Sequence, residues 1–465
     1  MNPMRGRDLL VLATLWLGLA ALALAHDGPE PHTHKVADAE IHKPTAIPDR
    51  ILLSWEGDPA TSAAVTWRTS AEVVPRIAEI ALATDGPGFP ATASKVIAVT
   101  TPLETDSGLA HCHTVSFTSL TPKTKYVYRV GDGENWSEWF QFQTASDQPE
   151  PFRFIYFGDA QNDIRSMWSR VIREAARDAP KAAFMLHAGD LINRPENDAD
   201  WGEWFQAGGP LHAMIPCIAT PGNHEYKVIS ELAGIPLKIE LSKYWKPTFA
   251  FPKNGPAKLQ ETAYFIDYQG VRIVSLNSNE RHAIQAEWLD KVLTDNPQKW
   301  TVVTFHHPLY STAIGRDNPL IRQAWQAVFD KHRVDLVLQG HDHSYGRTGL
   351  LRGENTTTGL AKQVPASGTV YVVSVSGPKQ YAAQRRPIFR RVAEDTQLYQ
   401  IIHIDGDQLR YEAHTATGKL YDAFILDKQP GQANRLTEQV PTIPENARPL
   451  EPQTPPAQTP EVEAP

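Results

Sequence analysis

The stretch VDLVLQGHDH (residues 334–343) runs from an apolar segment into two histidines that flank one aspartate. A short apolar run that ends at a glycine is typical of a buried β-strand, so the histidines should lie in the loop beyond its carboxyl end. A single His-x-His pair indicates a metal site only weakly, because polar residues are common in loops. Whether His341 and His343 bind a metal therefore depends on the rest of the chain.

Four further apolar runs end in the same way. They are FRFIYFGD (152–159), AAFMLHAGD (182–190), MIPCIATPGNHE (214–225) and WTVVTFHHP (300–308). Helical spacing at 163–178 and 284–293 separates them, and a hairpin at 263–278 and β-structure at 369–377 and 398–415 are also expected. This alternation favours an α/β domain with covered, mixed β-sheets over residues 150–426.

The ends of these runs carry side chains that bind metals. They are Asp159, Asp190, Asn223 with His224, His306 with His307, and His341 with His343. Loops at the carboxyl ends of strands converge in open α/β sheets, so these residues should form one site. Carboxylate, amide oxygen and imidazole together suit two metal ions of the Fe, Mn or Zn class. Two ions about 3.5–4 Å apart need an anionic bridge, which one aspartate with an oxygen on each ion would supply.

Residues 48–146 show a different, all-β pattern. AAVTWRT (63–69) and CHTVSFTSL (112–120) alternate between apolar and polar residues, with turn residues between the runs, which predicts a β-sandwich. The stretch LTPKTKYVYRVGD (120–132) resembles the corner of a fibronectin type III domain. No side chain of this domain suggests chemistry, so we expect it to serve as a scaffold or lid.

The two ends of the chain differ from its globular part. Arg5 and Arg7 precede an apolar stretch of 17 residues that ends Ala-Leu-Ala, which predicts a cleaved signal peptide over residues 1–25. An uncleaved membrane anchor is the alternative, since this length is near the lower limit for a bilayer span. We expect an exported protein, periplasmic or secreted, with no membrane segment after cleavage. Residues 26–47 should form a mobile, histidine-containing N-terminus, and the Pro-rich residues 427–465 a disordered tail.

Composition narrows the choice of partners. A net charge of −8 without a basic run gives no reason to expect nucleic acid. Cys112 and Cys217, the only cysteines, lie in different predicted domains, so separate thiols are favoured over a disulfide, although export would permit one. The lysine-rich segment 226–261 should form one wall of a pocket and suit an anionic substrate.

The ordered motifs resemble a known family. GDAQ (158–161), GDLIN (189–193), GNHE (222–225), VTFH (303–306) and GHDH (340–343) are similar to the five blocks of calcineurin-like metallophosphoesterases. The leading β-sandwich is similar to that of the purple acid phosphatase-like branch, and the resemblance covers roughly residues 48–426.

The resemblance implies a ligand set. The first ion would be held by Asp159, Asp190 and His343, and the second by Asp190, Asn223, His306 and His341, with Asp190 as the bridge. His224 would face the substrate, where it stabilises charge on the phosphoryl group or protonates the leaving oxygen.

Two positions depart from the family pattern. Asn193 stands where the purple enzymes have a tyrosine whose phenolate binds Fe(III) and gives the colour, so this protein should not be purple. Gln161 stands where other branches have a histidine. Either residue would ligate through an amide oxygen, which is a weaker donor, so the first site should hold its metal more loosely.

Two arginines are candidates for substrate contact. Arg194, in GDLINR, resembles the phosphate-binding arginine of the protein Ser/Thr phosphatases, with a surface ion pair as the alternative. Arg316 lies where plant purple phosphatases have histidines, and a solvated loop residue is the alternative. His307 is expected to support the site without binding metal.

The leading prediction is an exported binuclear-metal phosphohydrolase. It would hydrolyse phosphomonoesters of small molecules with a metal-bridging hydroxide, with Asp190, Asn223 and His224 in catalysis and Arg194, His224 and Arg316 at the substrate. A phosphodiesterase or phospholipase-like hydrolase on the same site is the near alternative. A non-catalytic surface binding module is the alternative from another class, and it would predict eroded ligand positions. Here only the tyrosine position, Asn193, has changed, and the other ligand positions and His224 keep residues of the right type.

Overall fold

The computed structural model describes residues 36–233, 235–352, 368–429, 432–439 and 441–448. The chain divides into two compact units, Met1–Ile41 and His42–Pro465. In the first unit, the described residues contain the short helix α2 (Asp38–Ile41), and the predicted signal peptide lies outside them. No helix in the described part of the chain is long and apolar enough to cross a bilayer.

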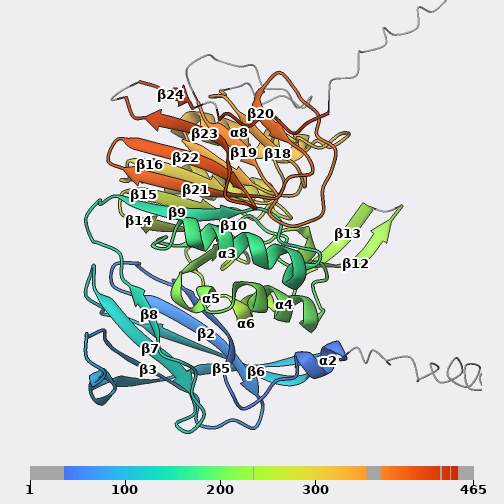
Figure 1. Cartoon of the computed structure of the whole chain (residues 1–465). Helices are drawn as coiled ribbons and strands as arrows, with labels where there is room; N and C mark the ends of the chain where they lie inside the picture. The colour runs from blue at the N-terminus through green and yellow to red at the C-terminus, as the bar shows by residue number, and fades with distance from the viewer. Residues whose placement is uncertain (1–35, 234, 353–367, 430–431, 440, 449–465) are drawn as a thin grey trace, which may run out of the picture. The chain divides into compact units, whose positions relative to one another are not determined.

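The second unit begins with the predicted β-sandwich (Figure 1). One antiparallel sheet has the order β1 (Asp49–Ser54), β2 (Ala63–Ser70), β6 (Gly108–Phe117), β5 (Val99–Thr105), and the other has β4 (Ser94–Ile97), β3 (Ile77–Leu82), β7 (Lys125–Gly131), β8 (Phe140–Gln143). Alternating side chains of both sheets, among them Val65, Trp67 and Tyr128, form a buried core. The Tyr126 hydroxyl accepts a hydrogen bond of 2.9 Å from the Thr121 amide, which ties β7 to the turn that precedes it.

The α/β domain that follows contains two seven-stranded sheets. The first has the order β11 (Cys217–Ala219), β10 (Met185–His187), β9 (Phe152–Phe157), β21 (Leu398–Asp405), β22 (Gln408–Thr415), β23 (Leu420–Asp427), β24 (Arg435–Glu438). The second has β14 (Tyr264–Tyr268), β15 (Val271–Ser275), β16 (Trp300–Thr304), β17 (Leu336–Gln339), β19 (Val370–Val373), β18 (Tyr345–Thr348), β20 (Phe389–Ala393). Strands β9, β10 and β11 are parallel, as are β15, β16, β17 and β19, so this domain has the mixed sheets that the sequence predicts.

Alternation along the inner strands divides the core. Ile273 and Val302 belong to the buried cluster that joins the two sheets, whereas their neighbours Val274 and Val303 belong to a second cluster. This second cluster also contains residues of α7 (His282–Thr294) and α8 (Pro319–His332), which therefore cover the outer face of the second sheet. On the first sheet, α3 (Ser169–Asp178) contributes buried residues to the first cluster (Figure 1). Both sheets are thus covered, and their strand ends are fixed by buried packing.

The remaining helical segments connect these layers. They are η1 (Phe89–Thr92), η2 (Ile164–Trp168), α4 (Asp198–Gly208), α5 (Leu211–Met214), η3 (Asn223–Glu225) and α6 (Trp245–Thr248). A separate hairpin of β12 (Tyr226–Leu232) and β13 (Ile235–Leu241) extends outward from the domain (Figure 1).

Two expected boundaries are wrong. The tail was expected to be disordered from residue 427, yet β24 pairs with β23 and the Asn446 amide bonds to the Tyr421 hydroxyl at 2.9 Å. Near the N-terminus, His42 is buried rather than mobile, and its carbonyl accepts a bond from Arg68. In both places, contacts with distant residues order a segment that its composition alone would leave free.

Both cysteines are buried and free. Cys112 lies on β6 and Cys217 on β11, as the prediction of separate thiols requires. Burial raises the pKa of the Cys112 thiol to about 12. A catalytic cysteine must be accessible and form a thiolate, and the buried Cys112 meets neither condition.

Candidate metal centre

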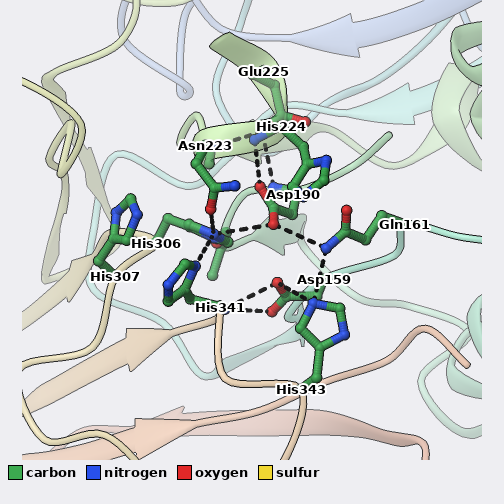
Figure 2. A network of polar contacts seen from close by, with 12 residues as sticks. Asp159, Gln161, Asp190, Asn223, His224, Glu225, His306, His307, His341 and His343 are labelled. Atoms are coloured by element: carbon green, nitrogen blue, oxygen red, sulfur yellow. Dashed lines mark hydrogen bonds and ion pairs between the residues drawn. The ribbon is translucent and has the colours of Figure 1, made fainter. Parts of the chain in front are cut away.

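The predicted ligand loops converge at the carboxyl ends of five parallel strands. Asp159, Asp190 and Asn223 follow β9, β10 and β11 of the first sheet, and His306 and the His341–His343 pair follow β16 and β17 of the second. Figure 2 shows these side chains meeting in one place, although they come from segments up to 184 residues apart in the sequence. The centre therefore lies where the strand ends of the two sheets meet.

The ligand loops have an unusual backbone. Four of the residues, Asp159, Asp190, His341 and His343, have positive φ values of 29°, 51°, 74° and 45°. Such values are costly for residues with a Cβ atom and are found mainly where a function requires them. At Gly340, an added Cβ atom would lie 2.4 Å from Asp159 Oδ2, so the glycine of GHDH is needed for close approach of the loops.

The first group of donors contains Asp159, Asp190 and His343, whose ligand atoms lie within 4.8 Å of one another. His343 Nε2 is 3.6 Å from Asp159 Oδ1, and His343 Nδ1 is held by the carbonyl of Lys379 at 2.9 Å. Because Nδ1 faces a carbonyl, it carries the proton and Nε2 is left as the donor to a metal.

Gln161 lies inside this first group. Its Nε2 donates to Asp190 Oδ2 at 3.0 Å and is 2.8 Å from His343 Nε2. Its Oε1 is buried without a hydrogen-bond partner among the described residues. Half a turn of the amide exchanges the two atoms and would give the group a further oxygen donor. The side chain is thus placed as the prediction of a weak ligand requires.

The second group is centred on His306. Its Nε2 is 3.2 Å from Asp190 Oδ2, 3.1 Å from Asn223 Oδ1 and 3.1 Å from His341 Nδ1. Its Nδ1 bonds to the carbonyl of Ala188 at 2.9 Å, which fixes the ring. Four donor atoms from four loops thus gather at one point, as ligands around a small ion do.

His307 lies closer to this group than the sequence suggested. Histidines 306, 307 and 341 form a second cluster of donors within 4.8 Å. However, His307 Nδ1 contacts the Ser278 hydroxyl at 2.8 Å, and its ring packs against that of His341 with centroids 4.3 Å apart. In this arrangement the ring supports His341 from the side.

Asp190 links the two groups through one oxygen. Its Oδ2 lies near His306 Nε2 on one side and Gln161 on the other, while Oδ1 accepts a bond of 2.9 Å from the His224 amide. Oδ2 thus faces both donor groups, whereas Oδ1 is engaged by a backbone amide (Figure 2). That one oxygen of Asp190 binds each ion stays a prediction.

Charge is concentrated in this buried place. Burial, together with the charge of Asp190, raises the pKa of Asp159. Burial also acts to raise the pKa of Asp190, but the positive charge of His306 holds it well below its usual value. The same pairing raises the pKa of His306 to about 9, although burial opposes it. Two buried carboxyl groups thus draw a positive charge into the site, and a metal cation would supply that charge in place of the proton.

Glu225 supports the site in a way that its position in the sequence does not indicate. Its carboxylate accepts backbone hydrogen bonds from Asp190, Leu191 and Gly222 at 2.8, 2.8 and 2.6 Å. It thereby ties the loop after β10 to the loop after β11. Burial and the nearby charge of Asp190 raise the pKa of Glu225 to about 7. The motif GNHE contains this residue, but only the structure shows which amides it binds.

His224 is placed to meet a substrate. Its Nδ1 is 2.6 Å from the carbonyl oxygen of Asn193, so this nitrogen carries the proton and Nε2 is free. The ring is only half-buried, unlike those of His306 and His343. Asn193 therefore contacts His224 through its backbone carbonyl. The residue also lines a separate hollow, together with Arg194 and Asp200.

The two candidate arginines have different surroundings. Arg194 forms an ion pair with Asp200 at 2.6 Å and also bonds to Asn197. This arrangement is the surface ion pair that the sequence left open as the alternative to phosphate binding. Arg316 lies at the centre, where its Nη1 donates to the His341 carbonyl at 3.1 Å and its guanidinium covers the Tyr381 ring at 4.9 Å. Of the two, Arg316 is the one in contact with a predicted ligand residue.

These residues fit the metals that the family motif implies. Oxygen and nitrogen donors from carboxylate, amide and imidazole groups surround two neighbouring points, with Asp190 Oδ2 between them. Imidazole rings are held by backbone carbonyls, as ligands to metals commonly are.

Two family models match the chain. The N-terminal domain of purple acid phosphatase matches residues 48–144, and the calcineurin-like phosphoesterase matches residues 152–345, together more than half of the sequence. The chain belongs to the calcineurin-like phosphoesterases, in their purple acid phosphatase-like branch. All five ligand loops, from Asp159 to His343, lie within the matched phosphoesterase segment.

Relatives of this branch come from several kingdoms. The chain is 28% identical over 338 residues to the uncharacterized protein Rv2577 of Mycobacterium tuberculosis, covering 63% of this chain and 61% of that protein, so it spans less than two thirds of that relative. It is 26% identical over 366 residues to human acid phosphatase type 7, covering 72% of this chain and 78% of the relative. It is 27% identical over 274 residues to the Fe(3+)-Zn(2+) purple acid phosphatase 12 of Arabidopsis thaliana, covering 55% and 56%.

The fold agrees with that of a plant member of the branch. Purple acid phosphatase PPD1 of yellow lupin seeds matches with a TM-score of 0.68 at 19% identity, covering 82% of this chain and 74% of the lupin chain. At this identity the likeness establishes the order of a β-sandwich and a phosphoesterase domain, and the site must be argued from its own residues.

Proposed function

We propose that this protein is an exported, metal-dependent phosphoric ester hydrolase that acts on phosphomonoesters. The observation that carries the proposal is the position of Asp190 Oδ2, which lies between two groups of metal donors. The names of the human and Arabidopsis relatives, which describe phosphatases, support the same activity.

The residues that would hold two ions are those predicted from the motifs. Asp159, Asp190 and His343, with Gln161, would hold one, and Asp190, Asn223, His306 and His341 the other. When bound, ions of the Fe, Mn or Zn class would activate water and neutralise charge on the phosphate. The printed metals of the Arabidopsis relative, Fe(3+) and Zn(2+), belong to this class.

The protein's own residues would position the ester and move a proton. Asn223 and Arg316 would bind phosphate oxygens, which limits the directions in which the ester can lie. His224 keeps its Nδ1 proton on the Asn193 carbonyl. Its Nε2 would first take up a proton from solvent, and the ring would then donate this proton to the leaving alcohol oxygen. The half-buried ring leaves room for the alcohol to depart toward solvent.

The first experiment is hydrolysis by the metal-stripped protein after each metal is restored singly and in pairs. A chromogenic phosphomonoester and its diester are compared, with Asp190→Ala against the exposed control Asp407→Ala. We expect metal-dependent release of phosphate, faster for the monoester, that Asp190→Ala lowers by at least about 1,000-fold, which is 4 kcal/mol of transition-state stabilisation. Faster diester cleavage would assign a phosphodiesterase instead. Folded protein that cleaves neither ester with any metal would contradict the proposal.

Export has its own test. The pattern of residues 1–25 predicts cleavage just before His26. Mass spectrometry of the protein recovered outside the cytoplasm should give a chain that begins at His26. A chain that retains residues 1–25 in a membrane fraction would contradict export with cleavage.

A further inference from the structure

A cleft begins at the metal centre and leads away from it. It has a volume of about 660 Å³, within the range of about 300–1,000 Å³ usual for ligand pockets. Asn223 and His307 line the end of the cleft at the centre. The walls farther out are apolar: Val228, Pro236, Leu237, Ile239, Leu320 and Ile321.

The hairpin β12–β13 presents one apolar face to this cleft. Val228 pairs with Ile239 across the two strands, so both side chains point to the same side. Leu237 also lines the cleft, at a point where the pairing of the two strands is irregular. Val228 and Leu237 are 46% and 65% exposed, although both are apolar. Apolar side chains that face a cleft and remain open to water are typical of a binding surface.

The charged residues of the hairpin lie elsewhere. Lys227 pairs with Glu240 on the opposite face, and neither residue lines the cleft. No lysine or arginine of the described chain lines it. Segment 226–261 therefore supplies a wall of this cleft, as expected, but none of its lysines lines it, so the expected fit to an anionic substrate is wrong for this cleft.

The acidic residues of the cleft already have partners. Glu280 accepts a bond of 2.9 Å from the Tyr226 hydroxyl and pairs with Arg281 at 3.2 Å. Asp317 pairs with Arg322 at 2.9 Å. Because these charges are neutralised locally, the cleft offers an uncharged, largely apolar surface beside a centre built for phosphate.

We propose that this cleft binds the apolar alcohol portion of the substrate, so that the preferred substrates are phosphomonoesters with an alkyl chain on the ester oxygen. The inference rests on the proposed phosphohydrolase function and deepens it. The phosphate lies at the metal centre, the ester oxygen lies near His224, and the chain extends over Val228, Leu237 and Leu320. The cleft reaches Asn223, which would hold a metal ion, and His307 beside it. A molecule bound in the cleft therefore lies next to the metal centre, and we assign the cleft to the substrate.

The test is a series of n-alkyl phosphates from methyl to octyl, whose alcohols have nearly equal acidity, so that chemistry changes little along the series. Phosphate release gives kcat/KM for each ester with the metal-loaded full chain. Full burial of a methylene group gives about fourfold per carbon, and these half-exposed walls should give about twofold, or about 100-fold between methyl and octyl.

The variant Leu237→Ser should reduce this rise at least threefold, because the chain then meets a polar wall. The matched control is Leu232→Ser, a leucine of the same hairpin that is equally exposed, at 68%, but does not line the cleft. This control should retain the full dependence on chain length. Octylphosphonate should also inhibit far more strongly than methylphosphonate, with a ratio that falls in Leu237→Ser and stays the same in Leu232→Ser.

The outcomes separate the two proposals. Equal kcat/KM for methyl and octyl phosphate, with active enzyme, would overturn the apolar cleft and leave the phosphohydrolase intact. Equal reductions in Leu237→Ser and Leu232→Ser would also overturn it, because the effect would then belong to the hairpin as a whole. Failure to hydrolyse any ester with any metal would contradict the proposed function itself.

Discussion

At the scale of single residues, the centre differs from the family pattern where amides replace stronger ligands. Gln161 lies between Asp190 Oδ2 and His343 Nε2, and its own oxygen is buried without a partner among the described residues. A buried amide oxygen without a bond is costly unless something binds it. We therefore expect the amide to make a half turn when the first metal binds, so that its oxygen faces the donor group and is satisfied by that metal.

Replacing Gln161 by leucine should weaken metal binding at one site only. Gln161→Leu keeps the volume of the side chain but removes the amide, and we expect the affinity of the first site to fall about 10-fold or more. Elemental analysis after equilibration over a range of buffered free Zn²⁺ concentrations gives the metal bound per chain, so weaker binding at one site shifts one of the two binding steps. Gln148→Leu, at an exposed position, is the control. Unchanged binding at both sites in Gln161→Leu would show that the amide is no ligand.

The colour of the iron-loaded protein tests the change at position 193. Asn193 has no phenolate, and it meets the site through its backbone carbonyl. We expect the protein loaded with Fe(III) to lack an intense visible absorption band. Tyr381, whose ring centroid is 4.7 Å from that of His343, is a tyrosine near the first donor group that could bind Fe(III) in place of the missing phenolate. An intense band that disappears in Tyr381→Phe would show that a phenolate from another loop ligates the iron.

At the scale of elements, the site depends on how the strand-end loops are tied together. Glu225 holds the amides of Asp190 and Leu191 in one loop and that of Gly222 in another. A glutamine at position 225 would have one acceptor oxygen in place of two, and its NH₂ group would face backbone N–H donors.

Glu225→Gln should therefore destabilise the fold and loosen the metals. We expect a loss of about 2 kcal/mol or more in the free energy of unfolding, because buried backbone donors lose their partner. The metal affinity should fall about 10- to 100-fold, since Glu225 orients a ligand. Urea unfolding and elemental analysis measure the two effects. Glu231→Gln, exposed on β12, is the control, and an equal response of both variants would refute the role of Glu225.

The sequence predicts the elements of this site better than their couplings. Apolar runs that end in Asp, Asn or His identify the five ligand loops, because strand ends converge in such sheets whatever the details. The role of Glu225 could not be read in the same way, since its partners are backbone amides up to 35 residues away. The orientation of the Asp190 carboxylate also depends on a distant contact, the His224 amide. The pairing of β24 was missed because proline-rich surroundings hide a four-residue strand.

At the scale of the whole unit His42–Pro465, the β-sandwich and the α/β domain are joined by a buried charge cluster. Asp198, at the start of α4, pairs with Arg50 of β1 at 2.7 Å and with Arg68 of β2 at 3.2 Å. Arg68 also pairs with Asp49 at 2.6 Å. Because Asp198 is fully buried, its charge must be balanced by these arginines, and the two domains should unfold together.

Acid should weaken this junction in a defined range of pH. Burial acts to raise the pKa of Asp198, but Arg50 and Arg68 hold it below its usual value. A carboxyl group with a lowered pKa in the folded state stabilises the fold above the unfolded value of about 3.9, and loses this contribution as the pH falls through the folded pKa. Asp198→Asn should therefore cost about 3 kcal/mol at pH 7, and the difference from the wild type should shrink below about pH 4. Urea midpoints at several pH values measure this, with the exposed Asp407→Asn as the control. A difference that stays constant down to pH 3 would mean that the charge of Asp198 does not stabilise the junction, and that its side chain matters there only for its shape and hydrogen bonds.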